Sequence, residues 1–487
     1  MGKEIAADSF SPSDLAEFTA KLREETALIK QWGKDGRFAS APLHLGCELE
    51  CCLTRKNFLP APVNHEFLHH YRDDDATVEV ARFNVEFNPR PLPWEKNTLL
   101  TFRRLLDDLC ATAAETAAAI DTRLLMTGLL PTLSMADFAD SMLTDRPRYR
   151  AFQQRLRELN RGRLFRVEIG SGEGLVCAVS NLAIEGAATS LQVHLQTAEE
   201  ESAAIYNAAQ VATAPVLAAG ANSPFFMGKH LWAETRVALF EQVLHERFPP
   251  PPSKARTRRR DDFFGLGYLS SSMLELFALN FENLPPLLPV VSDGNVADMA
   301  HLTLHNGTIW RWNRPVLGFA SDGSPTIRIE HRSLPAGPTA ADITANTALF
   351  VGLSWALREH FAPAQLTATA AQMPFARTRT NFYTAARDGL AAQLHWLDGR
   401  KYPVRMLLAE KLLPLAQNGL EEIGVDKNHA ADVLSLIAER VRQGQNGATW
   451  QRDYVHRHGD GMLGMVAMTE AYWHRQQSGA PVHEWTI

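Results

Sequence analysis

Four short segments alternate strictly between apolar and polar residues, and this alternation constrains the fold more than any other feature of the sequence. Successive side chains of a β-strand point to opposite faces of its sheet, so each segment can be divided into two faces. In the first segment, Glu48 and Glu50 share one face, while Cys47 and Leu49 share the other. The sequence therefore predicts strands with one apolar and one polar face. The four segments are residues 45–51, 83–88, 191–196 and 327–332.

The polar faces of these segments carry an unusual set of side chains. An ordinary antiparallel sheet with one face in water would explain the alternation, but such a face usually carries Lys and Thr, which these segments lack. Glu48 and Glu50 would repel each other unless a cation lay between them. Mg²⁺ binds carboxylate oxygens and keeps phosphate oxygens as further ligands. The faces thus predict a site for Mg²⁺ and nucleotide phosphates. Their members are Glu48, Glu50, Asn84, Glu86, Asn88, Gln192, His194, Gln196, Arg328, Glu330 and Arg332.

Helical and strand-like patterns are segregated along the chain rather than strictly alternating. Ser11, Pro12 and Asp14 give the start signal of a helix that Gly33 can close. This segregation predicts an α+β fold, with helices packed on one face of a sheet built from distant segments and an extra helical C-terminal part. Further helical patterns occupy residues 93–120, 199–247 and the chain after Thr339, and strand-like patterns occupy residues 43–87, 164–197 and 302–334.

The charge balance and the cysteines exclude several classes of protein. Forty-nine basic against 55 acidic residues give a net charge of −6, which argues against nucleic-acid binding by bulk charge. No apolar run reaches membrane-spanning length and the start lacks a signal-peptide core, so we expect a soluble, cytoplasmic protein that does not bind a membrane. The five cysteines form no paired metal-binding motif, which favours small buried residues of a reduced protein.

Three loop-like stretches fall outside these patterns. Residues 249–260 contain four prolines followed by a run of cationic residues, which is typical of a solvated surface loop. Such a run can also bind a polyanion. Residues 170–174 are glycine-rich but lack the full dinucleotide fingerprint, so a hairpin loop is the simplest interpretation. Asn306-Gly307 predicts a hairpin turn, followed by an aromatic strand.

Six motifs in the same order resemble the glutamate–cysteine ligase family, including its carboxylate–amine ligase branch, within the glutamine-synthetase-like superfamily. The resemblance covers about residues 43–350. The motifs are Gly46-x-Glu48-x-Glu50, residues 83–88, residues 128–133, Gln192-Val193-His194, Ala221-Asn222-Ser223-Pro224 with Trp232-x-Glu234-Thr235-Arg236, and Glu330-His331-Arg332 with Gly337-Pro338-Thr339.

The resemblance implies a fold and a reaction. The fold would be glutamine-synthetase-like, with an antiparallel sheet curved into a funnel that holds ATP and divalent cations, Mg²⁺ or alternatively Mn²⁺. In the reaction, ATP would phosphorylate a small carboxylate, such as that of the amino acid glutamate, and a small amine would attack the acyl phosphate to form an amide or γ-glutamyl-type bond. Glutamate–cysteine ligase itself, and a non-catalytic nucleotide- or metabolite-binding relative, are the alternatives.

The resemblance also implies roles for individual residues. Glu330 and Arg332 would be catalytic, and Arg332 would contact phosphate. Asn222 and Arg236 would bind the carboxylate substrate or its phosphate. Asn222 could instead belong to a turn, and Arg236 could be an ion-paired helix residue. Arg311 or Arg314 could reach the amine pocket. The implied metal ligands are Glu48, Glu50, Glu79, Glu86, His194 and Glu330.

Glu79 differs from the other implied ligands in its place in the strand pattern. It lies seven positions before Glu86 and so has the opposite parity. It joins the site only if the chain bends or bulges between the two residues.

We divide the chain into an N-terminal helix (1–40), a catalytic sheet domain (41–355) and a helical C-terminal segment (356–487) packed on the same unit. That segment could cover the active site, form the contact of a homo-oligomer or add to the core. Substrate identity and oligomeric state stay open.

Overall fold

The computed structural model describes residues 5, 9–40, 42–170, 174–245 and 261–487. The proline- and arginine-rich stretch 249–260 lies outside this part of the chain. The α-helices are α1 (Pro12–Lys34), α2 (Asn64–His70), α3 (Thr98–Ala119), α4 (Pro147–Leu159), α5 (Ser202–Gly220), α6 (Thr235–His245), α7 (Asp261–Phe264), α8 (Leu274–Asn283), α9 (Ala300–Gly307), α10 (Ala340–Ala356), α11 (Pro363–Gln372), α12 (Phe375–Asp388), α13 (Val404–Leu407), α14 (Leu413–Glu422), α15 (Lys427–Gln443), α16 (Gly447–His458) and α17 (Gly461–Gln477). The strands are β1 (His44–Arg55), β2 (Ala76–Val78), β3 (Asn84–Phe87), β4 (Leu92–Pro93), β5 (Thr122–Leu125), β6 (Phe165–Ile169), β7 (Leu175–Val179), β8 (Ser190–Thr197), β9 (Phe225–Phe226), β10 (Lys229–His230), β11 (Asn313–Phe319), β12 (Pro325–Pro335), β13 (Gln393–His395) and β14 (Lys401–Pro403).

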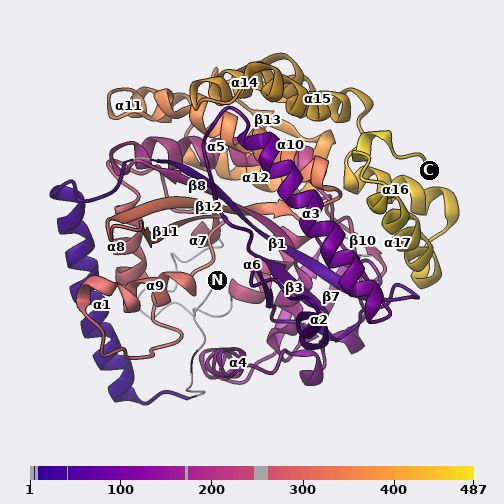
Figure 1. The fold of residues 1–487 in the computed structure, drawn as a ribbon, viewed down its shortest axis with the longest axis horizontal. Coiled ribbons are helices and arrows are strands. Elements are labelled where there is room, and N and C mark those ends of the chain that lie inside the picture. Colours follow the sequence, from indigo (N-terminus) through magenta and orange to yellow (C-terminus); the bar gives the residue numbers. More distant parts are fainter. Residues whose placement is uncertain (1–4, 6–8, 41, 171–173, 246–260) are drawn as a thin grey trace.

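An antiparallel sheet of eight strands organises the molecule (Figure 1). Its main path runs β11-β12-β8-β1-β3-β2, and β4 and β5 also pair with β1. The long central strands come from segments that are far apart in sequence, and the sheet curls into a half-barrel. The predicted α+β fold with a curved antiparallel sheet is therefore confirmed.

The apolar faces of the four predicted strands lie against helices. Leu49, Phe87, Val193 and Ile329 are fully buried on this side of the sheet, which contacts α5 and α10. Nearly all residues of α5 and α10 are buried, so neither helix has a solvent face. A helix that is buried all round needs a second covering layer.

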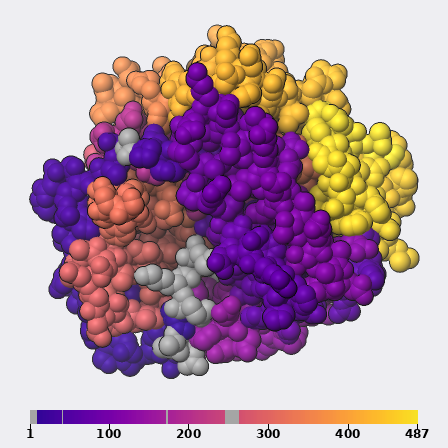
Figure 2. All heavy atoms as spheres, viewed as in Figure 1, coloured from indigo at the N-terminus to yellow at the C-terminus, as the bar shows by residue number. Residues whose placement is uncertain are grey.

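The C-terminal helices supply that layer. Helices α14 and α15 pack on α10, and α12 packs on α5; Figure 1 shows α14 and α15 beyond α5 and α10 as seen from the sheet. In Figure 2 the orange and yellow residues of this segment continue the surface of the same body. The buried side chains Leu420 and Leu434 belong to the same hydrophobic core as the sheet residues Leu49 and Val193. The segment after residue 356 therefore adds to the core.

The N-terminal helix begins as the sequence predicts. The Ser11 side chain accepts a hydrogen bond from the Asp14 amide, and the Asp14 side chain accepts one from the Ser11 amide. The helix ends at Lys34, one residue beyond Gly33. On its inner face, the buried carboxylate of Glu25 lies 2.5 Å from Nδ1 of His301 in α9, so α1 is fastened to the neighbouring helix α9.

The predicted hairpin at Asn306-Gly307 is wrong. These residues end helix α9, and the next strand, β11, begins only at Asn313. The helix forms because His301, Leu302 and His305 recur at helical spacing and are all buried, a pattern that outweighs the local turn preference of Asn-Gly. The aromatic stretch after Gly307 is consequently a loop rather than a strand.

Other local expectations are confirmed in the part of the chain that the structure describes. Strands β6 and β7 pair as a hairpin around the glycine-rich stretch, of which residues 171–173 lie outside the described residues. All five cysteines are free thiols, and Cys47, Cys51 and Cys52 are buried. Among the described helices, none has the length and apolar character needed to cross a membrane.

Candidate active site

Three side chains that could bind a metal ion, from three neighbouring strands, meet on the polar face of the sheet. Strand pairing places His194 of β8 directly opposite Glu330 of β12 and opposite Gly46 of β1, two residues from Glu48. One ligand atom from each of Glu48, His194 and Glu330 lies within 4.8 Å of the others. We call these residues the histidine triad.

A second group, the carboxylate triad, consists of Glu50, Glu79 and Glu86. Glu50 of β1 is paired with Glu86 of β3 in the strand register. Glu79 follows the end of β2, and residues 79–83 turn instead of continuing the strand. This turn removes the parity conflict and brings a Glu79 oxygen within 4.8 Å of the other two carboxylates. The structure thus brings all six predicted metal-ligating side chains into two adjacent groups.

The histidine triad is held by cations that keep its acids ionised. Arg314 donates to both oxygens of Glu330, at 2.8 Å from Nη2, and Arg332 also pairs with Glu330. Burial acts to raise the pKa of Glu330, but Arg314 and Arg332 outweigh it and hold the pKa well below its usual range. Burial lowers the pKa of His194 to about 4 although Glu48 opposes it. The histidine is therefore neutral at pH 7, as a metal ligand must be.

The carboxylate triad has the opposite electrostatics. Burial, followed by the charge of Glu86, raises the pKa of Glu50 from 4.5 to about 8. Burial and the neighbouring acids Glu86 and Glu50 raise the pKa of Glu79 well above its usual range. The pKa of Glu86 is also raised, by burial and by Glu48. Without a cation, these three carboxylates cannot all be charged at neutral pH.

Both groups fit divalent cations. Nε2 of His194 is buried and lies 3.5 Å from a Glu48 oxygen, yet it has no hydrogen-bond partner among the described residues. A buried ring nitrogen without a partner normally indicates a ligand. Three carboxylates side by side, of which Glu50 and Glu86 are buried, are stable when a cation neutralises them. The donor set of oxygens with one imidazole is compatible with Mg²⁺ or Mn²⁺.

These electrostatics predict a pH dependence for the metal-free protein. A carboxyl whose pKa is raised in the folded state stabilises the fold below its unfolded pKa, and this contribution is lost as pH rises through the folded value. For Glu50 this window runs from 4.5 to about 8. We expect the free energy of unfolding in EDTA to fall by about 1 kcal/mol per pH unit between roughly pH 7 and 8.

Urea unfolding with EDTA or with Mg²⁺ measures this effect. Mg²⁺ should stabilise the protein more at the higher pH, because the cation replaces protons. Burial lowers the pKa values of the histidines His305 and His331 to about 4 and about 3. Both therefore stay neutral in the folded protein between pH 7 and 8. A stability in EDTA that is constant or rises over this window would contradict the electrostatic description.

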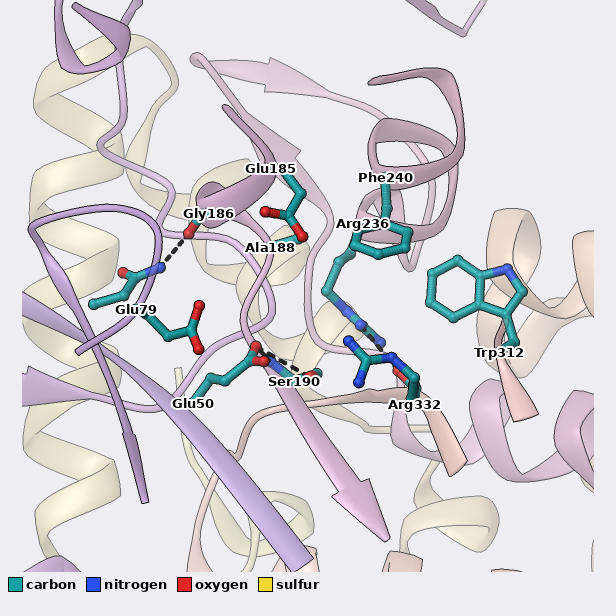
Figure 3. Close-up of a pocket in the computed structure, with 11 residues that line it drawn as sticks. Glu50, Glu79, Glu185, Gly186, Ala188, Ser190, Arg236, Phe240, Trp312 and Arg332 are labelled. Carbon is teal, nitrogen blue, oxygen red and sulfur yellow. Dashed lines mark hydrogen bonds between the residues drawn. The ribbon is translucent and has the colours of Figure 1, made fainter. Parts of the chain in front are cut away.

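Three cavities meet at the two triads. A cavity of about 420 Å³ lies on the Glu48 and His194 side and is lined also by His44, Phe319 and Arg328. A cavity of about 130 Å³ lies over both triads. A small cavity of about 30 Å³ lies beyond Glu50 and Glu79; Figure 3 shows these acids at one end of it and Arg236 and Arg332 at the other.

The two predicted phosphate-binding arginines both lie at the small cavity. Arg332 contacts Glu330 and the side-chain oxygen of Gln192, and its neighbouring acids raise its pKa although burial opposes them. Arg236, near the start of α6, is buried, with Nε 3.2 Å from Glu234 and its other nitrogens on the carbonyl oxygens of Arg332 and Ser333. Arg236 is therefore ion-paired, and it also lines the cavity.

Asn222 does not lie at the site. It is completely buried, and its side chain donates to the carbonyl oxygen of Ala336 and to the hydroxyl of Tyr472, both at 2.8 Å. Its side-chain oxygen accepts from Gln451 at 2.9 Å. These bonds connect the loop before β9 to α16 and α17. Protein partners saturate both the oxygen and the nitrogen of the Asn222 side-chain amide. The structure therefore does not place Asn222 among the ligand-binding residues.

We expect Asn222→Ala to destabilise the protein without weakening substrate binding. Three buried partners lose a hydrogen bond, which should lower the free energy of unfolding by about 3 kcal/mol. Below the unfolding temperature, KM for ATP should stay within about threefold of the wild-type value. Asn428→Ala, an exposed change on α15, is the matched control. A tenfold higher KM with unchanged stability would return Asn222 to the site.

The sequence does not single out four residues that build the site, namely Ser190, Glu185, Arg148 and Tyr149, whereas Gln192 belongs to a predicted polar face. Ser190 and Gln192 donate three hydrogen bonds to Glu50 and fix its carboxylate. Glu185 lines both smaller cavities, and Arg148 and Tyr149 of α4 line the larger of the two. Glu185 lies in a short 3₁₀ turn and carries no periodic signal, so no sequence pattern could identify it. Arg314 differs from Glu185 because it belongs to a strand, β11, and the strand register places it directly opposite Glu330.

Comparison with known proteins supports the curved-sheet fold. The structure resembles the glutamate–cysteine ligase of Francisella tularensis in complex with AMP, with 11% identity, 91% of this chain and 90% of that chain covered, and a TM-score of 0.52. A bifunctional glutathione synthetase from Pasteurella multocida aligns with 10% identity over 93% of this chain and 55% of that chain, with a TM-score of 0.45. No curated protein gives a significant match.

The family is shown by a match along the sequence. The model of glutamate–cysteine ligase family 2 (GCS2) covers residues 44–468, so the chain belongs to this family. It is an ATP-dependent carboxylate–amine ligase.

Proposed function

We propose that the enzyme activates the carboxylate of an amino acid as an acyl phosphate and transfers the acyl group to a small amine, with ATP and Mg²⁺. The observation that carries this proposal is the pairing of the two triads on one sheet face, each with ligand atoms within 4.8 Å. Two adjacent cation sites suit the transfer of a phosphoryl group, because cations stabilise both the attacking and the leaving oxygen.

The residues divide between two cation sites. Glu48, His194 and Glu330 would hold one divalent cation, and Glu50, Glu79 and Glu86 would hold the other. Mg²⁺, or alternatively Mn²⁺, supplies charge neutralisation of the triphosphate when bound. Arg314 and Arg332 act on the first site through Glu330, which they keep ionised and oriented.

The cavity sizes support an arrangement of the substrates. Of the three cavities that meet at the triads, only the one of about 420 Å³ beside the histidine triad has the size of a pocket for a nucleoside. The γ-phosphate would then lie over the triads, and the carboxylate and amine would enter the smaller cavities on the Glu50 side. Arg332 lines both of these cavities, so its guanidinium is placed to stabilise negative charge on the transferred phosphoryl group.

The reaction then follows in two balanced steps. A carboxylate oxygen attacks the γ-phosphorus, the bond to the β–γ bridging oxygen breaks, and ADP leaves with that electron pair. The neutral amine attacks the acyl carbon, the bond from carbon to the phosphate oxygen breaks, and phosphate leaves while the amine nitrogen loses a proton. Exclusion of water when both substrates are bound would protect the acyl phosphate from hydrolysis.

The alternatives make different use of the same site. A non-catalytic relative would be expected to lose ligands, whereas this structure assembles all six. Glutamate–cysteine ligase would restrict activity to one pair of substrates.

ADP release over a panel of amino-acid carboxylates and amines tests the proposal. We expect release that requires ATP, a divalent cation and both substrates. Activity confined to glutamate plus cysteine would show glutamate–cysteine ligase itself. No release with any pair would overturn the proposed function.

A further inference from the structure

The N-terminal helix α1 lies outside the part of the chain that the family model matches. That match begins at residue 44, whereas α1 ends at Lys34. The helix contacts α8 and α9 at the edge of the molecule (Figure 1), and Nζ of Lys21 donates to the carbonyl oxygen of Ser292 at 2.8 Å. A role of α1 in the site would therefore be a property of this chain rather than of the matched region.

The C-terminal end of α1 reaches the cavity of about 420 Å³ beside the histidine triad. Trp32 is buried and meets the ring of Phe319 edge-on, with centroids 6.3 Å apart and an interplanar angle of 83°. The guanidinium of Arg37 lies 4.9 Å from the centroid of the Trp32 ring. Ala39 lines the cavity, and its amide donates to the carbonyl oxygen of Pro325 at 2.9 Å. These contacts connect α1 to the ends of β11 and β12 that face the cavity.

Phe319 is exposed at this cavity. It is the last residue of β11, it lines the cavity, and it is 45% exposed although Trp32 packs against it. Pro42, Pro89 and Pro91 add apolar surface to the same cavity. A large exposed aromatic side chain at a cavity is typical of a ligand-binding surface. The flat ring suits a planar partner such as a nucleobase, because every base has a π-face that can stack on it.

The charged side chains of this cavity suit the other end of a nucleotide. Glu48 and His194 belong to the histidine triad, which would hold a cation. Arg328 also lines the cavity and is paired in the strand register with Gln196, two residues from His194. His44 contacts Gln196, with 3.2 Å between Nδ1 and Oε1. Cations and phosphates therefore use the polar sheet face, and the apolar surface is left for the base.

We infer that α1 positions the base-binding surface of the nucleotide site, because Trp32 holds the Phe319 ring and Phe319 stacks on the base. This inference rests on the proposed function, since it needs a nucleoside in this cavity. Phe319 would touch the substrate, and Trp32 would be a positioning residue that acts through it. Stacking also predicts selection by ring size. A purine covers more of the Phe319 ring than a pyrimidine does, so ATP and GTP should bind more tightly than CTP and UTP.

The first test changes the stacking ring in the full-length protein. Binding of non-hydrolysable analogues of ATP and UTP is measured with Mg²⁺, together with KM for ATP. In Phe319→Ala, Kd for the ATP analogue and KM for ATP should rise about 10- to 100-fold, and the preference over the UTP analogue should largely disappear. We expect kcat to stay within about twofold, because the ring touches no reacting atom. Phe319→Tyr keeps the ring and should stay within about threefold of wild type.

The second test asks whether Trp32 acts through Phe319. Trp32→Leu should raise Kd for the ATP analogue about three- to tenfold, and Trp32→Phe, which keeps an aromatic ring, should bind more nearly as wild type does. In the Phe319→Ala background, Trp32→Leu should add nothing, because the two changes remove one interaction. Phe18→Leu is the matched control. It truncates another buried aromatic of α1, which packs against His301, and should lower stability without changing Kd.

These measurements separate the inference from the proposed function. An unchanged Kd in Phe319→Ala or in Trp32→Leu, a further rise from Trp32→Leu in the Phe319→Ala background, or an equal rise in Phe18→Leu would overturn the inference. Because Phe319 is 45% exposed, its variants keep the test valid even if Trp32→Leu does not fold. Equal wild-type affinity for the ATP and UTP analogues would overturn the inference while leaving the proposed function standing. A wild type that binds neither analogue and releases ADP with no substrate pair would overturn both.

Discussion

Glu50→Gln should reduce ADP formation by about 1000-fold or more while leaving the fold intact. Glu50 belongs to the carboxylate triad, and three hydrogen bonds from Ser190 and Gln192 hold it in place. The amide keeps the shape of the side chain but removes one anionic ligand. A loss of about 4 kcal/mol of transition-state stabilisation, which corresponds to this factor, is typical of removing a major electrostatic contribution.

Stability provides the control for this variant. One hydrogen bond to Gln192 is lost, but the repulsion that raises the pKa of Glu50 is lost as well, so the free energy of unfolding of the metal-free protein should change by no more than about 1 kcal/mol. Glu168→Gln on β6 removes an exposed acid and should leave turnover unchanged. If Glu50→Gln turns over ATP as the wild type does, Glu50 does not bind a catalytic cation.

Arg440→Met should give the largest loss of stability in the C-terminal segment. Arg440 of α15 is 1% exposed and forms an ion pair of 2.7 Å with the fully buried Asp342 of α10. It also donates to Asn346 at 2.7 Å and to the carbonyl oxygen of Ala219 at 3.0 Å. Removing one partner of a buried pair leaves an uncompensated charge and costs about 3–5 kcal/mol. Urea and thermal unfolding measure the change.

Two further variants make this prediction specific. Arg442→Met changes an arginine on the same helix whose side chain is 68% exposed, and it should leave the free energy of unfolding nearly unchanged. The double variant Arg440→Met with Asp342→Leu should recover part of the loss, because no charge remains buried. If Arg440→Met were as stable as wild type, α15 would not be an integral part of the core.

Much of the sheet was predictable because one physical rule governs it. Side chains alternate across a strand, so Glu48, Glu50, Glu86, His194 and Glu330 could be assigned to one face from parity alone. The strand register then brings them together across β12, β8, β1 and β3. The order of these strands, and hence which ligands share a group, was beyond the sequence because pairing is non-local.

The alternation of side chains no longer predicts which face a residue lies on where the chain leaves the strand. Glu79 has the wrong parity for Glu86, and only the turn at residues 79–83 brings it to the same site. The hairpin expected at Asn306-Gly307 fails for a related reason, since the burial of His301 and His305 favours a helix over the local turn. Asn222 shows a further limit. A polar residue in a family motif looks like a ligand, but its partners Tyr472 and Gln451 lie about 230–250 positions away along the chain.

A crystal structure with Mn²⁺ and a non-hydrolysable ATP analogue tests the central claim most directly. We predict two anomalous peaks, one between Glu48, His194 and Glu330 and one between Glu50, Glu79 and Glu86, both contacting the phosphates of the nucleotide. The nucleoside should occupy the cavity of about 420 Å³ lined by His44, Phe319 and Arg328. A nucleotide bound elsewhere, or no Mn²⁺ at the two triads, would contradict the account.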